Sequence, residues 1–395
     1  MTEFETLHIK LHSLVVFRNL LHDPVLQKLD ALLQTPAADT AACVDAYCAF
    51  SAALFSKTDH FSSYLLKAVL EDENIYILKI CGPKPVSDVL HTCLDRELRF
   101  LQELSHFDGA SFRTALCYDG FLPMWGTRPF DFAEVYRGHV ETLGQHGYGI
   151  YAKYHVFTVQ NGKLVPVKHP DPQTLDALSG YEEERRKVLA NTRALLEGKP
   201  ASNVLLYGDA GTGKSSTVKA VANAFAEEGL RLIEVKKNQL YQIPDIVEIL
   251  SANPLKFILF IDDLSFSTND NDFAALKAIL EGSVSSHSSN LAVYATSNRR
   301  HLVKEKFSDR EGDEIHLADT MQELMSLSAR FGLTVTFSRP DKELYCHIVE
   351  NLALGYGIDM PRDTLLIKAE AHAIRNGGRS PRVAKQFIEQ LKAEI

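Results

Sequence analysis

The 395-residue sequence is poor in cysteine, glycine and proline. Its six cysteines are scattered through the chain without CxxC spacing, which argues against a disulfide framework and against a zinc knuckle. The 22 glycines and 15 prolines are too few for a fibrous or low-complexity chain. We therefore expect a globular cytoplasmic protein whose cysteines are reduced residues of the core.

The sequence also lacks the segments that mark membrane and exported proteins. No run approaches the roughly 18–20 consecutive apolar residues of a membrane span. The first ten residues, MTEFETLHIK, are acidic and do not form a basic stretch followed by an apolar one. The net charge of −9 excludes binding of polyanions by bulk charge, although a local basic face remains compatible with it. We expect no membrane partner.

The length predicts two to four domains, at about 100–200 residues for each. Residues 1–150 carry apolar side chains at helical spacing and predict a mostly helical N-terminal domain of unknown role, in which 75–80 fits either a short strand or a buried helix. Two β-rich runs around Asn161-Gly162 predict a hairpin, so that 151–178 is a hairpin and linker. Ser179 is the expected N-cap of a helix over 181–196.

The remaining chain predicts an α/β domain at 179–338 and a helical lid at 339–395. Five buried strands alternate with helices, which is typical of a parallel sheet with helices on both faces. The expected strands are 204–207, 232–235, 257–261, 291–295 and 333–337. After Pro340 only helical patterns follow.

Residues 208–215 match the pattern GxxxxGK[ST] directly after a strand, before a helix expected over 216–227. Glycines let such a loop turn its backbone N–H groups inward, where they and the helix N-terminus bind phosphates. A lysine adds a positive charge, and a hydroxyl suits the Mg²⁺ ion that bridges the phosphates. The sequence therefore predicts binding of ATP and Mg²⁺. The expected nucleotide-binding residues are Gly208, Asp209, Ala210, Gly211, Thr212, Gly213, Lys214, Ser215 and Ser216, with Ser215 also a metal ligand.

Polar residues follow two of the later strands. Asp262 and Asp263 end the strand at 257–261, and ligands of such sheets lie beyond the carboxyl ends of the strands. We expect Asp262 to hold Mg²⁺ through its water shell and Asp263, one methylene shorter than glutamate, to polarise an attacking water. Asn298, after the strand at 291–295, is expected to contact the γ-phosphate or orient that water. Its alternative role is that of a turn or cap residue.

These segments together resemble the AAA+ ATPases, with Walker A at 208–215, Walker B at 257–263 and sensor 1 at Asn298. The resemblance implies that Arg330 is an arginine finger and that Arg382, with Arg379 as fallback, is the sensor-2 arginine of the lid. The alternative role of Arg330 is that of an ion-pair partner, and Arg382 could instead be a surface arginine at a helix start. The resemblance also implies that Gly180 and Tyr181 lie against adenine. Because such fingers act in trans, it implies a homo-oligomer.

More closely, residues 151–395 are similar to an uncharacterised bacterial AAA+ family with a domain of unknown function. The stretches that carry this similarity are GYEEERRKVLANT, NVLLYGDAGTGKSS, IDDLSF, YATSNRRHL and GGRSPRVAKQF. In that family an acidic residue is expected before the finger, where this chain has Ala329.

The sequence thus predicts an ATPase that hydrolyses ATP to ADP and phosphate to remodel a client. The paired acids resemble those of helicase loaders, which favours a DNA-associated role, and Lys236 and Lys237 are candidate DNA contacts. One alternative is a slow nucleotide-gated switch, which the short Asp263 favours. Another is a protein client, with Tyr241 as a candidate pore residue. Arg299, Arg300 and the charged stretch at 304–316 are expected to be solvated or to contact partners.

Overall fold

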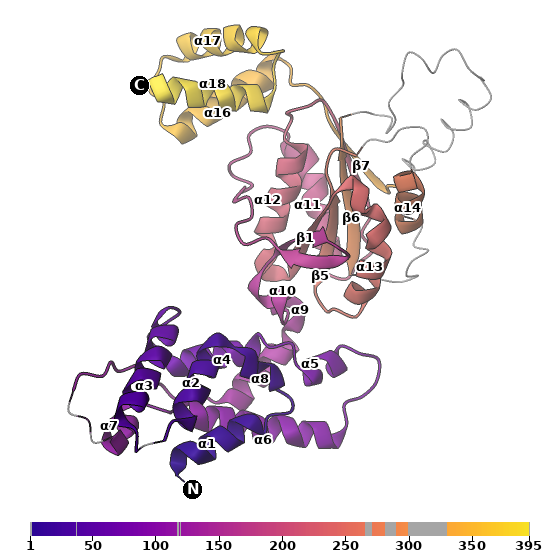
Figure 1. The fold of residues 1–395 in the computed structure, drawn as a ribbon. Helices are drawn as coiled ribbons and strands as arrows, with labels where there is room; N and C mark the ends of the chain where they lie inside the picture. Colours follow the sequence, from indigo (N-terminus) through magenta and orange to yellow (C-terminus); the bar gives the residue numbers. More distant parts are fainter. Residues whose placement is uncertain are drawn as a thin grey trace. The chain divides into compact units, whose positions relative to one another are not determined.

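The computed structural model describes residues 2–36, 38–116, 118, 120–264, 271–280, 290–298 and 330–394 (Figure 1). The chain divides into two compact units, Met1–Lys153 and Tyr154–Ile395. Within the described ranges no helix is both long enough and apolar enough to cross a membrane. Arg299, Arg300, Ala329 and the stretch at 304–316 lie outside these ranges.

The N-terminal unit is helical, as predicted, and residues 75–80 form a helix rather than a strand. Its helices are α1 (Glu3–His12), η1 (Arg18–His22), α2 (Pro24–Gln34), α3 (Thr40–Phe55), α4 (Phe61–Leu70), α5 (Ile75–Ile80), α6 (Asp88–Ser105), α7 (Gly109–Leu116), α8 (Phe132–Glu141), α9 (Leu143–His146) and α10 (Ile150–Lys153). Local signals set several of the starts. For example, Asn74 caps α5 by accepting the backbone N–H of Ile77.

One buried carboxylate joins distant parts of this unit. Glu97 of α6 is 9% exposed, and its carboxylate accepts the backbone N–H groups of Val15, Val16 and Phe17 at 2.8–3.0 Å. These groups belong to the turn between α1 and η1, which has no helical partner for them. A buried charge is tolerated when it is fully hydrogen-bonded, so Glu97 holds this turn against α6.

The cysteine prediction is only partly confirmed. The five cysteines in the described part of the chain are free. Cys43 lies in the core, as expected, but Cys48, five residues later on α3, is exposed. The expectation of core cysteines is wrong for Cys48, because five residues along a helix turn the side chain to another face.

The C-terminal unit contains a seven-stranded sheet in the order β2-β1-β4-β5-β6-β3-β7. Its strands are β1 (Val156–Gln160), β2 (Lys163–Pro166), β3 (Val204–Gly208), β4 (Leu230–Val235), β5 (Lys256–Ile261), β6 (Leu291–Ser297) and β7 (Leu333–Phe337). All five predicted core strands are present and pair in parallel. The predicted hairpin also forms, but β1 pairs in parallel with β4, so the hairpin extends the sheet.

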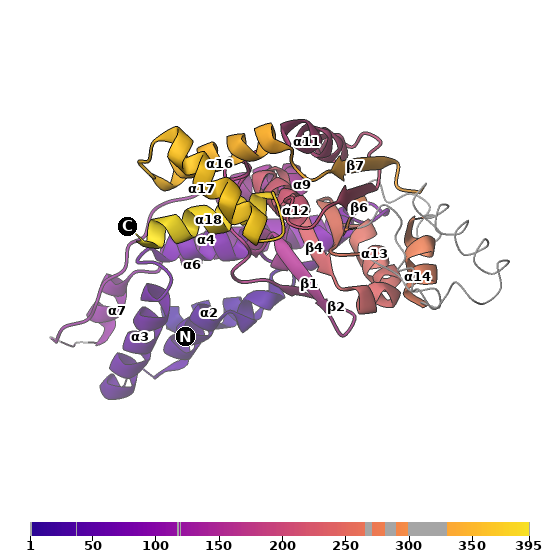
Figure 2. The same cartoon turned by 90° about the horizontal axis from the view of Figure 1, so that it is seen from above.

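Helices cover both faces of this sheet. They are α11 (Glu182–Leu196), α12 (Lys214–Ala224), η2 (Ala226–Glu228), η3 (Lys237–Gln242), α13 (Ile243–Ser251) and α14 (Asn271–Leu280). In Figures 1 and 2, α11 and α12 lie on one face of the sheet, and α13 and α14 lie on the other. After β7 come the three lid helices α16 (Lys342–Tyr356), α17 (Arg362–Arg375) and α18 (Pro381–Glu394).

Two helix starts differ from the prediction. The N-cap of α11 is Tyr181 in a left-handed conformation (φ 62°) without a side-chain cap, so Ser179 does not cap this helix. Three glutamates in the first turn instead complement the positive end of the helix dipole. Helix α12 begins at Lys214, two residues earlier than expected, because the left-handed Gly213 (φ 92°) ends the preceding loop.

We predict that Glu97→Ala destabilises the N-terminal unit by about 3 kcal/mol, because it leaves buried N–H groups without an acceptor. Urea unfolding would measure the free energy, and hydrogen exchange at residues 15–17 would localise the loss. The matched control is Glu103→Ala on the same helix, which removes an exposed ion pair with Lys10 worth under about 1 kcal/mol. Equal losses in the two variants would contradict the role of Glu97.

Candidate functional site

The glycine-rich loop at 208–215 is held by the edge strand β7. Gly208 has φ 138°, and a Cβ atom there would lie 2.0 Å from the carbonyl oxygen of Phe337. That same carbonyl accepts the backbone N–H of Asp209 at 3.1 Å. The close approach of the two backbones therefore requires glycine at 208, and it directs the loop toward the start of α12.

Lys214 lies almost completely buried in this loop, with 6% of its surface exposed. Its ammonium donates to the carbonyl oxygens of Gly208 and Asp209 at 2.9 and 2.7 Å and to Oδ1 of Asn298 at 3.0 Å. Burial lowers the pKa of Lys214, and the charge of Arg382 lowers it further, while three nearby aspartates raise it. An anion bound beside Lys214 would relieve this cost of a buried cation.

Ser215 and Asp262 meet across the strand ends. The Ser215 hydroxyl donates to Asp262 Oδ1 at 2.6 Å, and the Thr296 hydroxyl donates to the same oxygen at 2.5 Å. Thr296 also accepts the backbone N–H of Asp263 at 2.9 Å. A carboxylate beside a hydroxyl is a set of hard oxygen donors, which fits Mg²⁺.

Asn298 connects the lysine to the second aspartate. While its Oδ1 accepts from Lys214, its Nδ2 donates to Asp263 Oδ1 at 2.8 Å. Asp263 has a left-handed backbone (φ 51°), which is an uncommon conformation for a residue other than glycine. The side chains of Lys214, Asn298 and Asp263 therefore form one continuous hydrogen-bonded line, which joins the phosphate loop at 208–215 to the residues that follow β6 and β5.

A cavity of about 730 Å³ lies over this line, between the sheet and the lid. The predicted residues that line it are Ala210, Gly211, Thr212, Gly213, Lys214, Ser215, Ser216, Asp262, Asp263, Asn298 and Arg382. The lid contacts the loop directly, because the backbone N–H of Arg382 donates to the carbonyl of Gly211 at 3.2 Å. The fallback residue Arg379 instead pairs with Glu370 inside the lid.

Four of the predicted nucleotide-binding residues lie outside the cavity lining. Gly208 and Asp209 form the support of the loop, and Asp209 Oδ2 accepts the backbone N–H of Arg339, the first residue of the lid, at 2.9 Å. Tyr181 packs its ring on Phe337 and donates its hydroxyl to the carbonyl of Ser338 at 2.6 Å. A Cβ atom on Gly180 would lie 3.0 Å from side-chain atoms of α16. The contact of Gly180 and Tyr181 with adenine stays a prediction.

Several side chains at the cavity were not singled out from the sequence. Thr296 sits inside a buried strand, where threonine is common, so its type carries no signal. Arg185 is 8% exposed and donates to the carbonyls of Gly180 and Leu178, which orders the chain before α11. From the lid come Ile348, Asn351, Leu352, Gly355, Tyr356 and Lys385.

Arg330 and the phosphate loop lie at opposite ends of two neighbouring strands, β7 and β3. Arg330 precedes β7, which runs parallel to β3 with Val204 opposite Leu333 and Gly208 opposite Phe337. Arg330 therefore lies before the amino end of a five-residue strand, and the loop follows the carboxyl end of its neighbour. A strand of this length spans about 16 Å. Arg330 is partly exposed and is not among the residues that line the cavity.

Residues 151–395, the whole C-terminal unit included, match the family described as "Protein of unknown function (DUF815)". The chain belongs to this family. The AAA+ resemblance is also supported, because the DUF815 chain has distant AAA+ relatives.

Among curated proteins, the chain is 28% identical over 116 residues to the replication factor C large subunit of Sulfolobus acidocaldarius, covering 28% of this chain and 26% of that protein. It is 26% identical over 114 residues to an AAA-ATPase of Arabidopsis thaliana, covering 27% and 21%. The chain thus spans about a quarter of the length of the curated relatives it matches.

Among solved structures, similar chains include the Thermotoga maritima RuvB Holliday junction branch migration motor and the FIGL-1 AAA domain in complex with ADP. The first has 17% identity and a TM-score of 0.38, covering 56% of this chain and 65% of that one. The second has 18% identity and a TM-score of 0.38, covering 57% and 74%.

We predict that Thr296→Val destabilises the C-terminal unit by about 1–3 kcal/mol, because it keeps the shape of the side chain but leaves Asp262 and the Asp263 N–H without their shared partner. Urea unfolding and hydrogen exchange at residues 257–264 would measure the change. The control Thr336→Val alters an exposed position on the edge strand β7 and should have an effect within about 0.5 kcal/mol. Matching values for the two variants would contradict the role of Thr296.

Proposed function

We propose that this protein is a magnesium-dependent AAA+ ATPase that hydrolyses ATP to ADP and phosphate in the cytoplasm to remodel a client. The observation that carries the proposal is the hydrogen-bonded line from Lys214 through Asn298 to Asp263 beneath the cavity. A buried cation, a neutral amide and a carboxylate in this order suit phosphate binding, orientation and activation of water.

Lys214 is the phosphate-binding residue of this proposal. An ammonium has three N–H donors, and all three now meet oxygens of Gly208, Asp209 and Asn298. An ammonium forms a stronger hydrogen bond to an ionised phosphate oxygen than to a neutral amide oxygen, because both partners are then charged. We infer that Asn298 is the partner that yields, since it is the only side chain among the three. When Asn298 reorients, its hydrogen bond to Asp263 breaks. Arrival of the γ-phosphate would thereby free the Asp263 carboxylate to act as the base.

Ser215 and Asp262 are the proposed Mg²⁺ ligands. Their oxygens already lie 2.6 Å apart at the floor of the cavity, and Thr296 fixes the carboxylate. When bound, Mg²⁺ neutralises charge on the phosphates. Asp263 then orients or deprotonates the water that attacks the γ-phosphate in line, while the lid and Arg382 close over the nucleotide.

Arg330 is the proposed finger, and its position supports action in trans. Because Arg330 lies before the amino end of β7, the length of that strand separates it from the phosphate loop of its own chain. A planar guanidinium with permanent charge is suited to the charge that develops on a transferring phosphoryl group. We therefore propose a homo-oligomer in which each Arg330 completes the site of a neighbour.

The second candidate function is a nucleotide-gated switch with little turnover. Two backbone N–H groups of the lid donate to the phosphate loop, that of Arg382 to the carbonyl of Gly211 and that of Arg339 to the carboxylate of Asp209. Movement of the loop on nucleotide binding would therefore reach the lid even without hydrolysis. The short side chain of Asp263 favours this reading, because it reaches less far toward a water than glutamate does.

The proposed client is DNA, with protein as the alternative. Lys236 is exposed beside the short helix η3, and Tyr241 within η3 is 66% exposed. Cations with an exposed aromatic ring suit both a nucleic acid backbone and its bases. The name of one curated relative, a replication factor, points in the same direction. Lys237 belongs to the same segment.

We predict that Asp263→Asn and Arg330→Ala each lower steady-state ATP hydrolysis at least 100-fold, and that a one-to-one mixture regains activity. In the mixture, the Asp263→Asn subunit retains the finger Arg330, and the Arg330→Ala subunit retains the base Asp263. In randomly mixed rings about a quarter of the interfaces pair an intact site with an intact finger. Specific activity of the wild type should also rise with protein concentration.

The turnover of the wild type separates the two candidate functions. Turnover that is negligible in the wild type, with ATP still bound, would support the switch and overturn the ATPase. Activity that survives in Arg330→Ala would overturn the trans finger. Arg379→Ala is the control variant, because Arg379 pairs with Glu370 inside the lid and should tolerate replacement with less than a tenfold loss.

A further inference from the structure

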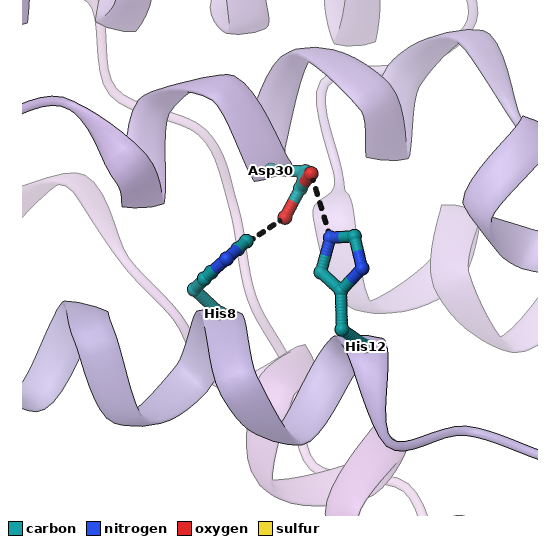
Figure 3. Close-up of side chains that lie close together, drawn as sticks. All are labelled: His8, His12 and Asp30. Atoms are coloured by element: carbon teal, nitrogen blue, oxygen red, sulfur yellow. Dashed lines mark hydrogen bonds and ion pairs between the residues drawn. The ribbon is translucent and has the colours of Figure 1, made fainter.

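Two histidines and one aspartate of the N-terminal unit point their polar atoms at one another (Figure 3). Nδ1 of His8 lies 2.7 Å from Oδ1 of Asp30, and Nε2 of His12 lies 3.0 Å from Oδ2 of the same carboxylate. One ligand atom from each residue lies within 4.8 Å of the other two. This cluster belongs to the unit that carries no part of the nucleotide cavity.

The packing of α1 against α2 sets this geometry. His8 and His12 are four residues apart on α1, which places both imidazoles on one side of the helix, one turn apart. Each directly follows a buried leucine, Leu7 or Leu11. On α2, Asp30 likewise follows the buried Leu29. The three polar side chains therefore lie along the rim of a packed helix pair, and both helices hold them in place.

We propose that His8, His12 and Asp30 bind a divalent transition-metal ion, with Zn²⁺ as the best fit. Two imidazole nitrogens and one carboxylate oxygen form a mixed set that suits zinc and neighbouring ions and does not suit the all-oxygen preference of Mg²⁺ or Ca²⁺. The site rests on geometry alone and is independent of the proposed ATPase.

The distances permit an ion without rearrangement of the helices. In a tetrahedral zinc site with bonds near 2 Å, neighbouring ligand atoms lie about 3.3 Å apart. Nδ1 of His8 and Nε2 of His12 lie 2.7 and 3.0 Å from different oxygens of Asp30, which is about 0.6 and 0.3 Å closer than in such a site. An ion held by one oxygen of Asp30 needs the side chains to rotate until that oxygen faces both imidazoles, and one ligand atom of each residue already lies within 4.8 Å of the other two.

The surroundings of the cluster favour a site with an open position. Gln34, one turn after Asp30 on α2, donates its amide to Asp30 Oδ2 at 2.9 Å and steadies the carboxylate. The side chains of His8, His12 and Asp30 are 28%, 43% and 18% exposed, so the ion is reached from solvent. Three protein ligands leave the fourth position of zinc to water or to a group of a partner.

The competing interpretation is a pair of histidine–aspartate hydrogen bonds with no affinity for metal. Zn²⁺ and the imidazole protons use the same nitrogen and oxygen atoms, so metal binding would replace both hydrogen bonds. Titration with the metal separates the two interpretations.

We predict that the full chain, stripped of metal and free of nucleotide, binds Zn²⁺ at the cluster and that His12→Ala weakens this binding at least tenfold. Competition with a chromogenic chelator gives the affinity and the number of ions bound per chain. The thermal midpoint of the wild type should rise with added Zn²⁺, because the ion joins α1 to α2. Asp30→Asn, which keeps the side-chain shape but removes the charge, should abolish the rise.

His106→Ala is the matched control, since His106 is exposed on the same unit and lies outside the cluster. Lys214→Ala is the second control and should bind Zn²⁺ as the wild type does, which separates this site from the nucleotide site. Unchanged circular dichroism of His12→Ala without metal would verify its fold. Two results would overturn the proposal. One is a wild-type protein that takes up no Zn²⁺ at micromolar concentration, and the other is equal Zn²⁺ binding by the wild type and His12→Ala.

Discussion

The parallel pairing of β6 with both β3 and β5 is the constraint on which the candidate nucleotide site depends. In this register Tyr207 lies opposite Ser297 and Ile261 lies opposite Ala295. The residues that follow these positions emerge at one edge, and they include the loop with Lys214, the acids after β5 and Asn298. A slip of one residue in any pair would turn the polar side chains of that strand end away from the others.

Buried charges in both units are stabilised in the same way. Lys214 meets two carbonyl oxygens and one amide oxygen, and Glu97 meets three backbone N–H groups. In each unit a charged side chain thereby fixes a stretch of chain that has no regular partner. The difference lies in the surroundings. Lys214 borders a cavity with room for a ligand, whereas Glu97 lies inside packed helices and has only a structural role.

The loop and the lid are coupled through two hydrogen bonds. Asp209 and Gly211 each accept an N–H group from the segments at Arg339 and Arg382. The bond from Arg382 joins two backbone atoms, whereas the bond from Arg339 ends on the Asp209 carboxylate. The coupling therefore depends on the fold and on one side chain. It gives the cavity one wall from the sheet and one from the lid, which is the arrangement in which a bound ligand can alter the angle between them.

The sequence by itself determined the strands of the core, the helical character of residues 1–150 and the residues of the phosphate loop. These follow from local patterns, because apolar periodicity and glycine spacing act over a few residues. Only the tertiary structure decided that the hairpin joins the sheet, that Thr296 fixes Asp262, that Arg382 rather than Arg379 borders the cavity, and that His8 and His12 face Asp30. Each of these depends on the pairing of segments far apart in the chain. No single segment encodes such a pairing, because it results from burying all the apolar faces at once.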